Sequence, residues 1–267
     1  MSLGEFTTAA ELPQKGDRFS AGSKNIDGML GGGLETGTVT QFYGEAGSGK
    51  SLLCYTTCVL LPPDSKAIYI DTEGKFRPYS IELIAQGRGL NPSAVLQKIQ
   101  VAKPENSRQQ EGYIEKACSS IKSDPKIKLL IVDSIINLYK ADYPERSRLP
   151  QRQQQLNKYM HMLSNIAQSN NVAVIITNHI QSSPHRFSCS RNRRVVPAGG
   201  NIISYPTTYR VRLMPLFPTL LNAEMGYSDR YMAILEHGPI SCSKTYFTID
   251  SSGITDYVDD DDDVGSW

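Results

Sequence analysis

Residues 38–51 have the sequence TVTQFYGEAGSGKS. The β-branched and aromatic residues of Thr38–Tyr43 predict a strand, and Lys50–Leu60 is predicted to be a helix. Between them, Gly44–Ser51 match the spacing GxxxxGKS, in which glycines let successive backbone N–H groups turn inward and approach a phosphate closely. A loop of this kind that follows a strand and opens a helix is typical of a nucleoside triphosphate site.

The residues of this loop have distinct predicted roles. Lys50 is expected to reach the β- and γ-phosphates of ATP, and Ser51 is expected to ligate Mg²⁺. The N-terminus of the following helix adds a partial positive charge that favours the anion. We therefore predict ATP and Mg²⁺ as cofactors, with the nucleotide held by Gly44, Glu45, Ala46, Gly47, Ser48, Gly49, Lys50, Ser51 and Leu52.

Carboxylates follow two further apolar strands. Leu129–Asp133 is an apolar run that ends in a carboxylate, and Asp133 is predicted to be the second protein ligand of Mg²⁺; the alternative is a core strand that ends in a turn-forming aspartate. Ala67–Asp71 is followed closely by Glu73, so either acid could orient the water that attacks the terminal phosphate. Spacing leaves both open, because an aspartate at such a place can equally cap a turn.

Short apolar strands alternate with helices along most of the chain. This alternation predicts an α/β fold with a mostly parallel sheet covered on both faces, and the pattern after Ile203 predicts antiparallel strands that close the sheet. The expected strands are Thr38–Tyr43, Ala67–Asp71, Lys98–Val101, Leu129–Asp133, Val172–Thr177, Tyr209–Met214, Arg230–Leu235 and Tyr246–Ile249, and the expected helices are Ser23–Leu30, Lys50–Leu60, Ile81–Gln86, Arg108–Lys122 and Leu156–Ala167.

Composition narrows the class of protein. The 267 residues, 39% of them hydrophobic, can bury one substantial core. No apolar run reaches the roughly 18 residues of a membrane span, and the N-terminus lacks a signal-peptide pattern. Five cysteines without a CxxC pair favour a reducing, intracellular setting without structural zinc. The net charge is +1 although residues 259–263 are all aspartate, so the rest of the chain is moderately basic, which is compatible with a phosphate-rich partner.

Several motifs stand beyond the glycine-rich loop: Asp71–Pro78 (DTEGKFRP), Ile131–Tyr139 (IVDSIINLY), Ile176–Asn178 (ITN), Gly199–Ile203 (GGNII) and Ser252–Asp256 (SGITD). Together with the loop they resemble the RecA family, specifically the archaeal and eukaryotic branch of RadA and related recombinases. The resemblance extends from Phe6 to Asp256. It implies a RecA-type P-loop ATPase core with a mostly parallel central sheet, flanking helices and a C-terminal antiparallel extension.

The resemblance also implies roles for single residues. It makes Glu73 the carboxylate that activates water, beside Lys50 on the phosphates and Asp133 on Mg²⁺. His179 stands where the family has a glutamine that senses the γ-phosphate and relays the nucleotide state to the DNA-binding loops. A histidine can also donate to a phosphate, with different geometry and a possible charge. The alternative is a core histidine without such a role.

Two basic segments resemble the DNA-binding loops of the family, Lys140–Arg152 and Ile180–Ala198. Arginine suits phosphate oxygens, and Phe187 could stack on a base, which together would suit single-stranded DNA of any sequence. The alternative is a pair of solvated basic loops. The predicted DNA contacts are Lys140, Arg146, Arg148, Arg152, Arg186, Arg191, Arg193 and Arg194.

Phe6-Thr7-Thr8-Ala9 resembles the FxxA segment with which family members add to the sheet edge of a neighbouring subunit. Phe6 and Ala9 are therefore predicted to mediate self-association into a filament. The chain is accordingly divided into a flexible linker at residues 1–18, a RecA-like ATPase core at 19–256 and an acidic, disordered tail at 257–267.

Departures from the family pattern leave two functions open. Family recombinases carry a small helical domain before the core, and here only 43 residues precede the glycine-rich loop. Ser80 stands where the family often has an arginine that stacks on adenine. Glu236-His237-Gly238 stands in place of the usual Asp-Ser-Pro segment, which caps the nucleotide of a neighbouring subunit. The expected function is a DNA-dependent ATPase that forms filaments on single-stranded DNA and exchanges strands with a duplex in homologous recombination and DNA repair. The alternative is a paralogue that binds ATP, DNA and a recombinase with little hydrolysis or strand exchange.

A third class, a P-loop enzyme that acts on small molecules, would need a lid and an acceptor pocket, and the sequence indicates neither. The expected location is intracellular, without a membrane partner: the nucleus if the source is eukaryotic, and the cytoplasm or nucleoid if it is archaeal.

Overall fold

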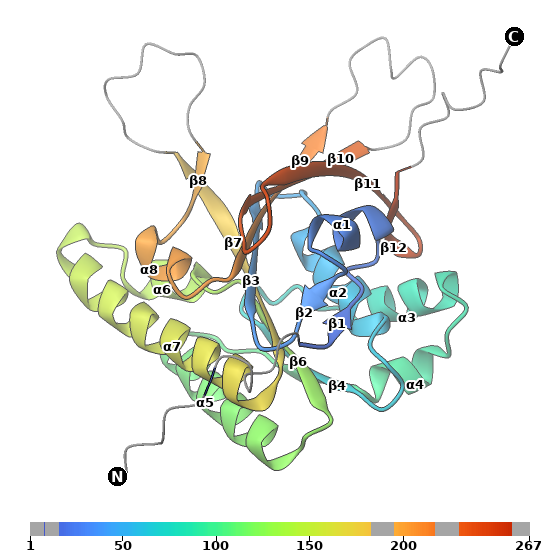
Figure 1. Ribbon diagram of the computed structural model, residues 1–267. Helices are drawn as coiled ribbons and strands as arrows, with labels where there is room; N and C mark the ends of the chain where they lie inside the picture. Colours follow the sequence, from blue (N-terminus) through green and yellow to red (C-terminus); the bar gives the residue numbers. More distant parts are fainter. Residues whose placement is uncertain (1–7, 9–15, 183–194, 217–229, 258–267) are drawn as a thin grey trace, which may run out of the picture.

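The computed structural model describes Thr8 and residues 16–182, 195–216 and 230–257 (Figure 1). The predictions for Phe6, Ala9, Phe187, Arg186, Arg191, Arg193, Arg194 and the aspartate run lie outside these residues. The strands are β1 (Arg18–Phe19), β2 (Leu34–Glu35), β3 (Val39–Gly44), β4 (Lys66–Asp71), β5 (Ile99–Ala102), β6 (Ile127–Asp133), β7 (Ala173–Ser182), β8 (Val195–Pro197), β9 (Tyr209–Leu216), β10 (Arg230–His237), β11 (Ser243–Asp250) and β12 (Gly253–Asp256).

The helices differ widely in length. They are α1 (Lys24–Met29), α2 (Lys50–Val59), α3 (Pro78–Gly87), α4 (Pro92–Leu96), α5 (Ser107–Ser123), α6 (Asn137–Asp142), the 3-10 turn η1 (Arg146–Arg148), α7 (Leu149–Asn170) and α8 (Asn201–Ser204). Among the described residues, no helix combines the length and the apolar character that crossing a membrane would require.

One large sheet organises the chain, in the order β12-β11-β10-β9-β3-β7-β6-β4-β5. The strands from β9 to β5 pair in parallel, whereas β9, β10, β11 and β12 pair antiparallel. Parallel neighbours require crossover connections, which the helices supply. The predicted α/β architecture, a mostly parallel sheet with an antiparallel C-terminal extension, is confirmed.

Helices cover both faces of the parallel strands (Figure 1). Helices α1 to α4 pack on one face around Phe42, Leu53 and Tyr69. Helices α5 to α8 pack on the other face, where Leu130 of β6 and Leu163 of α7 belong to the same buried cluster. Because side chains alternate along a strand, each central strand contributes to both cores, which explains the continuous apolar runs in the sequence.

The segment 140–152, predicted to be a loop, is largely helical. Lys140 lies in the last turn of α6, and Arg152 lies in the first turns of α7. The apolar periodicity that identified α7 begins only at Leu156, so the polar first turns gave no signal. Pro150 is compatible with this helix because a proline in the first turn removes an N–H that has no intrahelical partner.

The second basic segment has a β-hairpin stem. Strand β7 continues past the predicted end at Thr177 to Ser182, and β8 pairs with it antiparallel, with Ile180 opposite Pro197 and Ser182 opposite Val195. The ends of the predicted loop Ile180–Ala198 are therefore strands, and residues 183–194 lie outside the described part of the chain.

Both ends of the core extend slightly beyond the predicted boundaries. Arg18 belongs to β1, and its guanidinium donates to the carbonyl oxygens of Leu30 (2.7 Å) and Gly33 (3.0 Å) and to Glu35 (2.8 Å). At the other end, the Arg230 guanidinium lies 3.9 Å from the ring centroid of Tyr257. The residues at 18 and 257 thus pack with the core rather than with the flanking segments.

Candidate nucleotide-binding site

The carboxyl ends of β3, β7, β6 and β4 lie side by side, because these four strands are consecutive and parallel in the sheet. Gly44 ends β3, and Asp71 and Asp133 are directly opposite each other at the ends of β4 and β6. His179 pairs with Gly44 across β7 and β3. Four segments that are distant in the sequence therefore meet at one sheet edge, where open α/β sheets place their ligands.

The glycine-rich loop has the backbone that its sequence predicts. A Cβ atom at Gly44 would lie 2.2 Å from the carbonyl oxygen of Leu213, so no larger residue fits there. Gly49 has φ of 88° and caps α2 without a side-chain hydrogen bond. Since the first N–H groups of a helix have no intrahelical partner, the uncapped start of α2 fits a phosphate group.

Lys50 is buried within this loop. Its ammonium group donates to the carbonyl oxygens of Gly44 (3.1 Å) and Glu45 (2.6 Å) and to Oγ of Ser48 (3.3 Å). Burial lowers the pKa of Lys50, and the nearby carboxylates of Asp133 and Glu73 act in the opposite direction. The cation thus lies in the field of both acids, at the place where triphosphate oxygens would replace the loop carbonyls as its partners.

Asp133 is held by the two strands that flank β6. Its Oδ2 accepts a hydrogen bond of 2.6 Å from the Tyr69 hydroxyl of β4, and its Oδ1 accepts one from the Thr177 hydroxyl of β7. A carboxylate has about four lone-pair sites, so each oxygen retains acceptor capacity. Tyr69 and Thr177 were missed by sequence reasoning, although a polar residue that ends the apolar run VAVIIT was a usable signal.

The donor set at this edge fits Mg²⁺. Ser51 in the first turn of α2 and Asp133 at the end of β6 offer oxygen ligands, which this hard cation prefers. The described residues contain no group of three or more His, Cys, Asp or Glu side chains that could hold an ion alone.

The two acids after β4 have different surroundings. The Asp71 carboxylate is buried and accepts hydrogen bonds from the backbone N–H groups of Glu73 (3.2 Å), Lys75 (3.2 Å) and Phe76 (2.8 Å). It therefore caps the turn that follows the strand, which was one of the two readings of the sequence. Of the two candidates, Glu73 is the acid whose carboxylate is directed toward other side chains of the site.

Glu73 contacts a histidine and a lysine. Its Oε1 lies 2.6 Å from Nε2 of His179, and its Oε2 accepts a hydrogen bond of 2.7 Å from the Lys75 ammonium. The hydrogen bond with His179 is the largest influence on the pKa of Glu73, which falls to about 2 despite the opposing effect of burial. Lys75 was not singled out from the sequence, although it lies in the same DTEGK motif.

Of the predicted DNA contacts, the described ones lie on α6, η1 and α7. Burial, followed by the charge of Arg152, lowers the pKa of Lys140, so these two cations lie close enough to interact although they are twelve residues apart. Arg148 is exposed at the N-terminal end of α7. The structure thus brings two of the predicted cations of the first basic segment, Lys140 and Arg152, close together.

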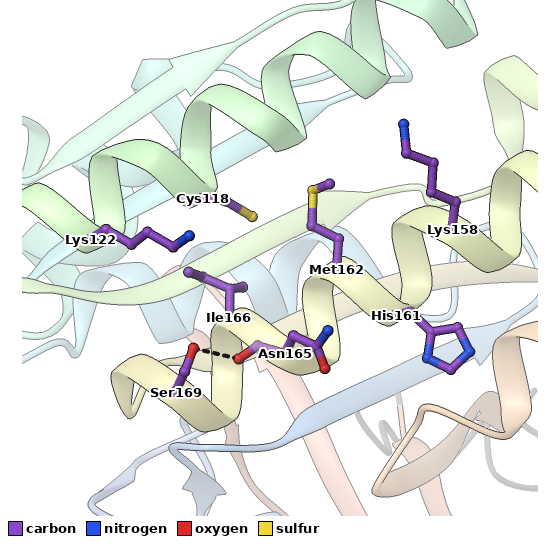
Figure 2. Close-up of a pocket in the computed structure, with 8 residues that line it drawn as sticks. All are labelled: Cys118, Lys122, Lys158, His161, Met162, Asn165, Ile166 and Ser169. Atoms are coloured by element: carbon purple, nitrogen blue, oxygen red, sulfur yellow. Dashed lines mark hydrogen bonds between the residues drawn. The ribbon is translucent and has the colours of Figure 1, made fainter. Parts of the chain in front are cut away.

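Two pockets lie away from the nucleotide site. A cavity of about 350 Å³ lies between α5 and α7, with Cys118 and Lys122 on one helix and His161 among the residues of the other (Figure 2). A smaller one of about 130 Å³ opens beside β5, the edge strand of the sheet. The residues that line it are Ile68, Gln100, Val101, Ala102, Tyr113, Lys116, Ala117 and Ser120.

Comparison with known proteins agrees with this geometry. The sequence model of the Rad51 family matches residues 16–257, which include the whole described core from β1 to β12. The chain belongs to the Rad51 family. It is 38% identical over 219 residues to the DNA repair and recombination protein RadA of Aeropyrum pernix, a match that covers 78% of this chain and 67% of the relative.

Membership of the Rad51 family confirms the predicted RecA/RadA resemblance. The family consists of ATP-binding and DNA-binding proteins of DNA recombination and repair. The segment Glu236-His237-Gly238, which departs from the family pattern, makes contacts within its own chain. Glu236 accepts a hydrogen bond of 2.6 Å from the Tyr43 hydroxyl, and its carboxylate lies 3.4 Å from Nε of Arg210.

Proposed function

We propose that this Rad51-family chain is the core of an ATP-dependent recombinase that binds single-stranded DNA, assembles into a filament and exchanges strands with a duplex. The observation that carries the proposal is the convergence of Lys50, Asp133 and Glu73 at one sheet edge, where the Lys50 ammonium interacts with the charges of both carboxylates. Phosphoryl transfer depends mainly on positioning and on charge stabilisation, and such a cluster provides both.

The proposed roles follow the contacts. Lys50 and the amides of the loop bind the β- and γ-phosphates, and Ser51 and Asp133 hold Mg²⁺, which when bound neutralises phosphate charge. Glu73 accepts a proton from the attacking water while the oxygen of that water bonds to the terminal phosphorus. The bridging P–O bond then breaks, and ADP and phosphate leave.

DNA is proposed to bind to the two basic segments. Lys140 and Arg152 support this proposal, because two cations held near each other repel unless an anion lies between them, and a DNA phosphate would relieve that repulsion. Residues 183–194 carry the remaining predicted arginines and extend from the β7–β8 stem. Both segments follow strands whose ends form the nucleotide site, which favours coupling between ATP and DNA.

Self-association is proposed to occur at the edge strand β5. An edge strand presents backbone groups without a neighbour, and an extended segment of another copy can pair with them. Val101 in β5 is 39% exposed, and the pocket beside it is lined by apolar side chains such as Ile68 and Ala117. We propose that Phe6 of a second copy enters this pocket.

The paralogue function stays a second candidate for a specific reason. Both oxygens of the Glu73 carboxylate have partners, and its pKa of about 2 makes it a weak base. Glu236 is likewise engaged within its own chain instead of being free to cap a neighbour's nucleotide. Slow hydrolysis and weak contact between subunits would follow from these two features.

The test is the rate of ATP hydrolysis with and without single-stranded DNA, for the parent protein, Lys50→Ala and Glu73→Gln. The proposal expects stimulation by DNA in the parent, loss of ATP binding in Lys50→Ala, and ATP binding without turnover in Glu73→Gln. A folded parent protein that shows no affinity for ATP with Mg²⁺ would refute it.

A strand-exchange assay then separates the two candidate functions. The recombinase converts homologous single-stranded and duplex DNA to joint molecules in the presence of ATP. A protein that binds ATP and DNA but forms none, and that co-purifies with a separate recombinase, is the paralogue.

A further inference from the structure

The cavity of about 350 Å³ between α5 and α7 takes no part in the proposed nucleotide chemistry. On its floor, Cys118 of α5 faces Met162 and Ile166 of α7 (Figure 2). Cys118 and Ile166 are buried and Met162 is half-buried, so the floor is apolar. A methionine side chain also adapts to ligands of different shape. The residues that line this α5–α7 groove include Cys118, Lys122, Lys158, His161, Met162 and Ile166.

Cationic side chains stand at the rim of the α5–α7 groove. Lys122, in the last turn of α5, forms no ion pair with any residue that the structure describes. Lys158 lies 3.5 Å from Glu115, but both side chains are more than half exposed, so water and salt screen this pair. None of the described lining residues is acidic. The lining residues therefore carry a net positive charge, which favours an anionic ligand.

The groove has the length of a short peptide. Lys158 and Ser169 mark its two ends on α7, which rises about 1.5 Å per residue, so the ends lie about 16 Å apart. An extended chain advances about 3.3 Å per residue, and about five residues would therefore span the groove. A peptide that carries both carboxylates and an apolar side chain would match the rim and the floor together.

A segment of this kind follows the core of the chain itself. Residues 259–263 are all aspartate, and Val264 and Trp267 come shortly after them. The aspartates suit the cations of the rim, and a tryptophan buries a large apolar area when it enters a pocket. This acidic tail lies outside the described residues, and the proposed ATP chemistry makes no use of it.

The acidic tail of one chain is too short to reach the groove of the same chain. Tyr257 is held by the Arg230 guanidinium beside β12, and Ile254 of β12 packs on the face of α1 to α4. The groove lies on the opposite face, where α7 packs on β7 (Figure 1). In the sheet order, β7 is separated from β12 by about 24 Å at about 4.8 Å per strand, and the helix layer adds to this distance. The chain from Tyr257 to Asp263 spans at most about 22 Å.

We propose that the α5–α7 groove binds the acidic tail, residues 259–267, of a second copy of this chain. The aspartates lie beside Lys122 and Lys158, and an apolar side chain of the tail packs against Met162 and Ile166. This contact goes beyond the proposed function, because it requires neither ATP nor DNA. It also uses the other flank of α5 from the pocket beside β5, which Tyr113 and Lys116 line.

A fluorescent peptide of residues 258–267 tests the groove in the full chain, by anisotropy without nucleotide. The parent protein should bind the peptide, and Lys122→Glu should weaken binding by about tenfold because an attraction becomes a repulsion. Raising the salt concentration from about 0.05 M to about 0.5 M should weaken binding to the parent. Lys24→Glu makes the same charge change at an exposed residue of α1, on the opposite face, and should bind like the parent.

Variants of the peptide separate charge from apolar contact. Val264→Ala together with Trp267→Ala should weaken binding to the parent by at least about tenfold, because the apolar anchor is lost. A peptide with lysine in place of all five aspartates should bind the double variant Lys122→Glu/Lys158→Glu more tightly than it binds the parent. Urea unfolding of each protein variant establishes that the fold is retained.

Mixing two variants of the whole chain tests whether the contact joins separate copies. Both carry Val101→Asp, which is designed to remove the proposed contact at β5. One lacks residues 258–267 and keeps the groove, and the other keeps the tail and carries Lys122→Glu/Lys158→Glu. Sedimentation velocity should show a two-copy species in the mixture and only monomers of each variant alone.

Three results would overturn the inference. One is a folded parent protein that does not bind the peptide, another is equal affinity of the parent and Lys122→Glu, and the third is a mixture that stays monomeric. None of these results bears on ATP binding or strand exchange, so the proposed function would stand. Conversely, a parent protein that fails to bind ATP refutes the proposed function and leaves the peptide experiment valid.

Discussion

The hydroxyl of Tyr69 in β4 donates a 2.6 Å hydrogen bond to Oδ2 of Asp133 in β6, between two buried side chains of adjacent parallel strands. Thr177 in β7 donates to the other oxygen of the same carboxylate. Asp133 is therefore fixed from both neighbouring strands, and the orientation of this proposed Mg²⁺ ligand is set by the hydroxyl groups of Tyr69 and Thr177.

Removing one of these supports should weaken the binding of Mg²⁺. We expect Tyr69→Phe to lower the Mg²⁺ affinity of the ATP complex by about tenfold, as outer partners of metal ligands typically do, and to destabilise the fold by about 1 kcal/mol. The measurement is a Mg²⁺ titration of fluorescent ATP analogue binding, together with urea unfolding. Tyr209→Phe, which loses a 2.6 Å bond to Glu35 far from the site, should change stability alone.

Substitution of the two acids at the end of β4 should have different effects, on stability for Asp71 and on ATP hydrolysis for Glu73. Asp71→Ala removes the carboxylate that accepts hydrogen bonds from three backbone N–H groups of the turn. We therefore expect the free energy of unfolding to fall by about 1–2 kcal/mol and the side chain of Glu73 to be displaced. Glu73→Gln should leave the fold within about 1 kcal/mol of the parent while hydrolysis falls at least about a hundredfold. Chemical unfolding measures the stability of both variants, and single-turnover ATP hydrolysis measures their chemistry. A stable Asp71→Ala protein that no longer hydrolyses ATP, together with an active Glu73→Gln protein, would assign Asp71 as the base.

Self-association should depend on the β5 edge. Val101→Asp places a charge on an exposed residue beside the pocket, so we expect an unchanged melting temperature and a shift to smaller species in gel filtration. Phe6→Glu should cause the same shift. Leu90→Asp alters a residue of similar exposure (40%) away from the sheet edge and should elute like the parent. Unaltered elution of Val101→Asp would remove β5 as the interface.

Stability should depend on pH through Glu73. A carboxyl group with a lowered pKa in the folded state binds its proton less tightly there, so it stabilises the fold above its unfolded pKa near 4.5 and loses that contribution as the pH falls toward about 2. The difference in unfolding free energy between the parent and Glu73→Gln should shrink between pH 6 and pH 3, by on the order of 1 kcal/mol because solvent partly screens the imidazole. Glu105→Gln, an exposed control, should show no such change; if both variants behave alike, the His179 contact is weak in solution.

The local sequence pattern was sufficient to predict the helices and strands that are regular and apolar. The strand before the glycine-rich loop, the buried run at Leu129–Asp133, the start of β7 and the apolar face of α7 were all predicted within a few residues, whereas β7 extends past its predicted end. The short elements β1, β8 and α8 were not, because two to four residues carry no measurable periodicity and form only against a partner. The polar start of α7 was missed for a related reason: its helical form is favoured by continuity with the packed turns that follow.

The sequence alone determined that a phosphate-binding loop joins a strand to a helix, because that motif is a property of eight consecutive residues whose backbone freedom and charge are local. It also determined the class of the fold, since the periods of strands and helices are local as well. Tertiary structure decided which acid is a turn cap and which faces the site, that Tyr69 and Thr177 hold Asp133, and that His179 holds Glu73. These contacts join residues up to 106 positions apart, and only the order of strands in the sheet brings them within hydrogen-bond distance.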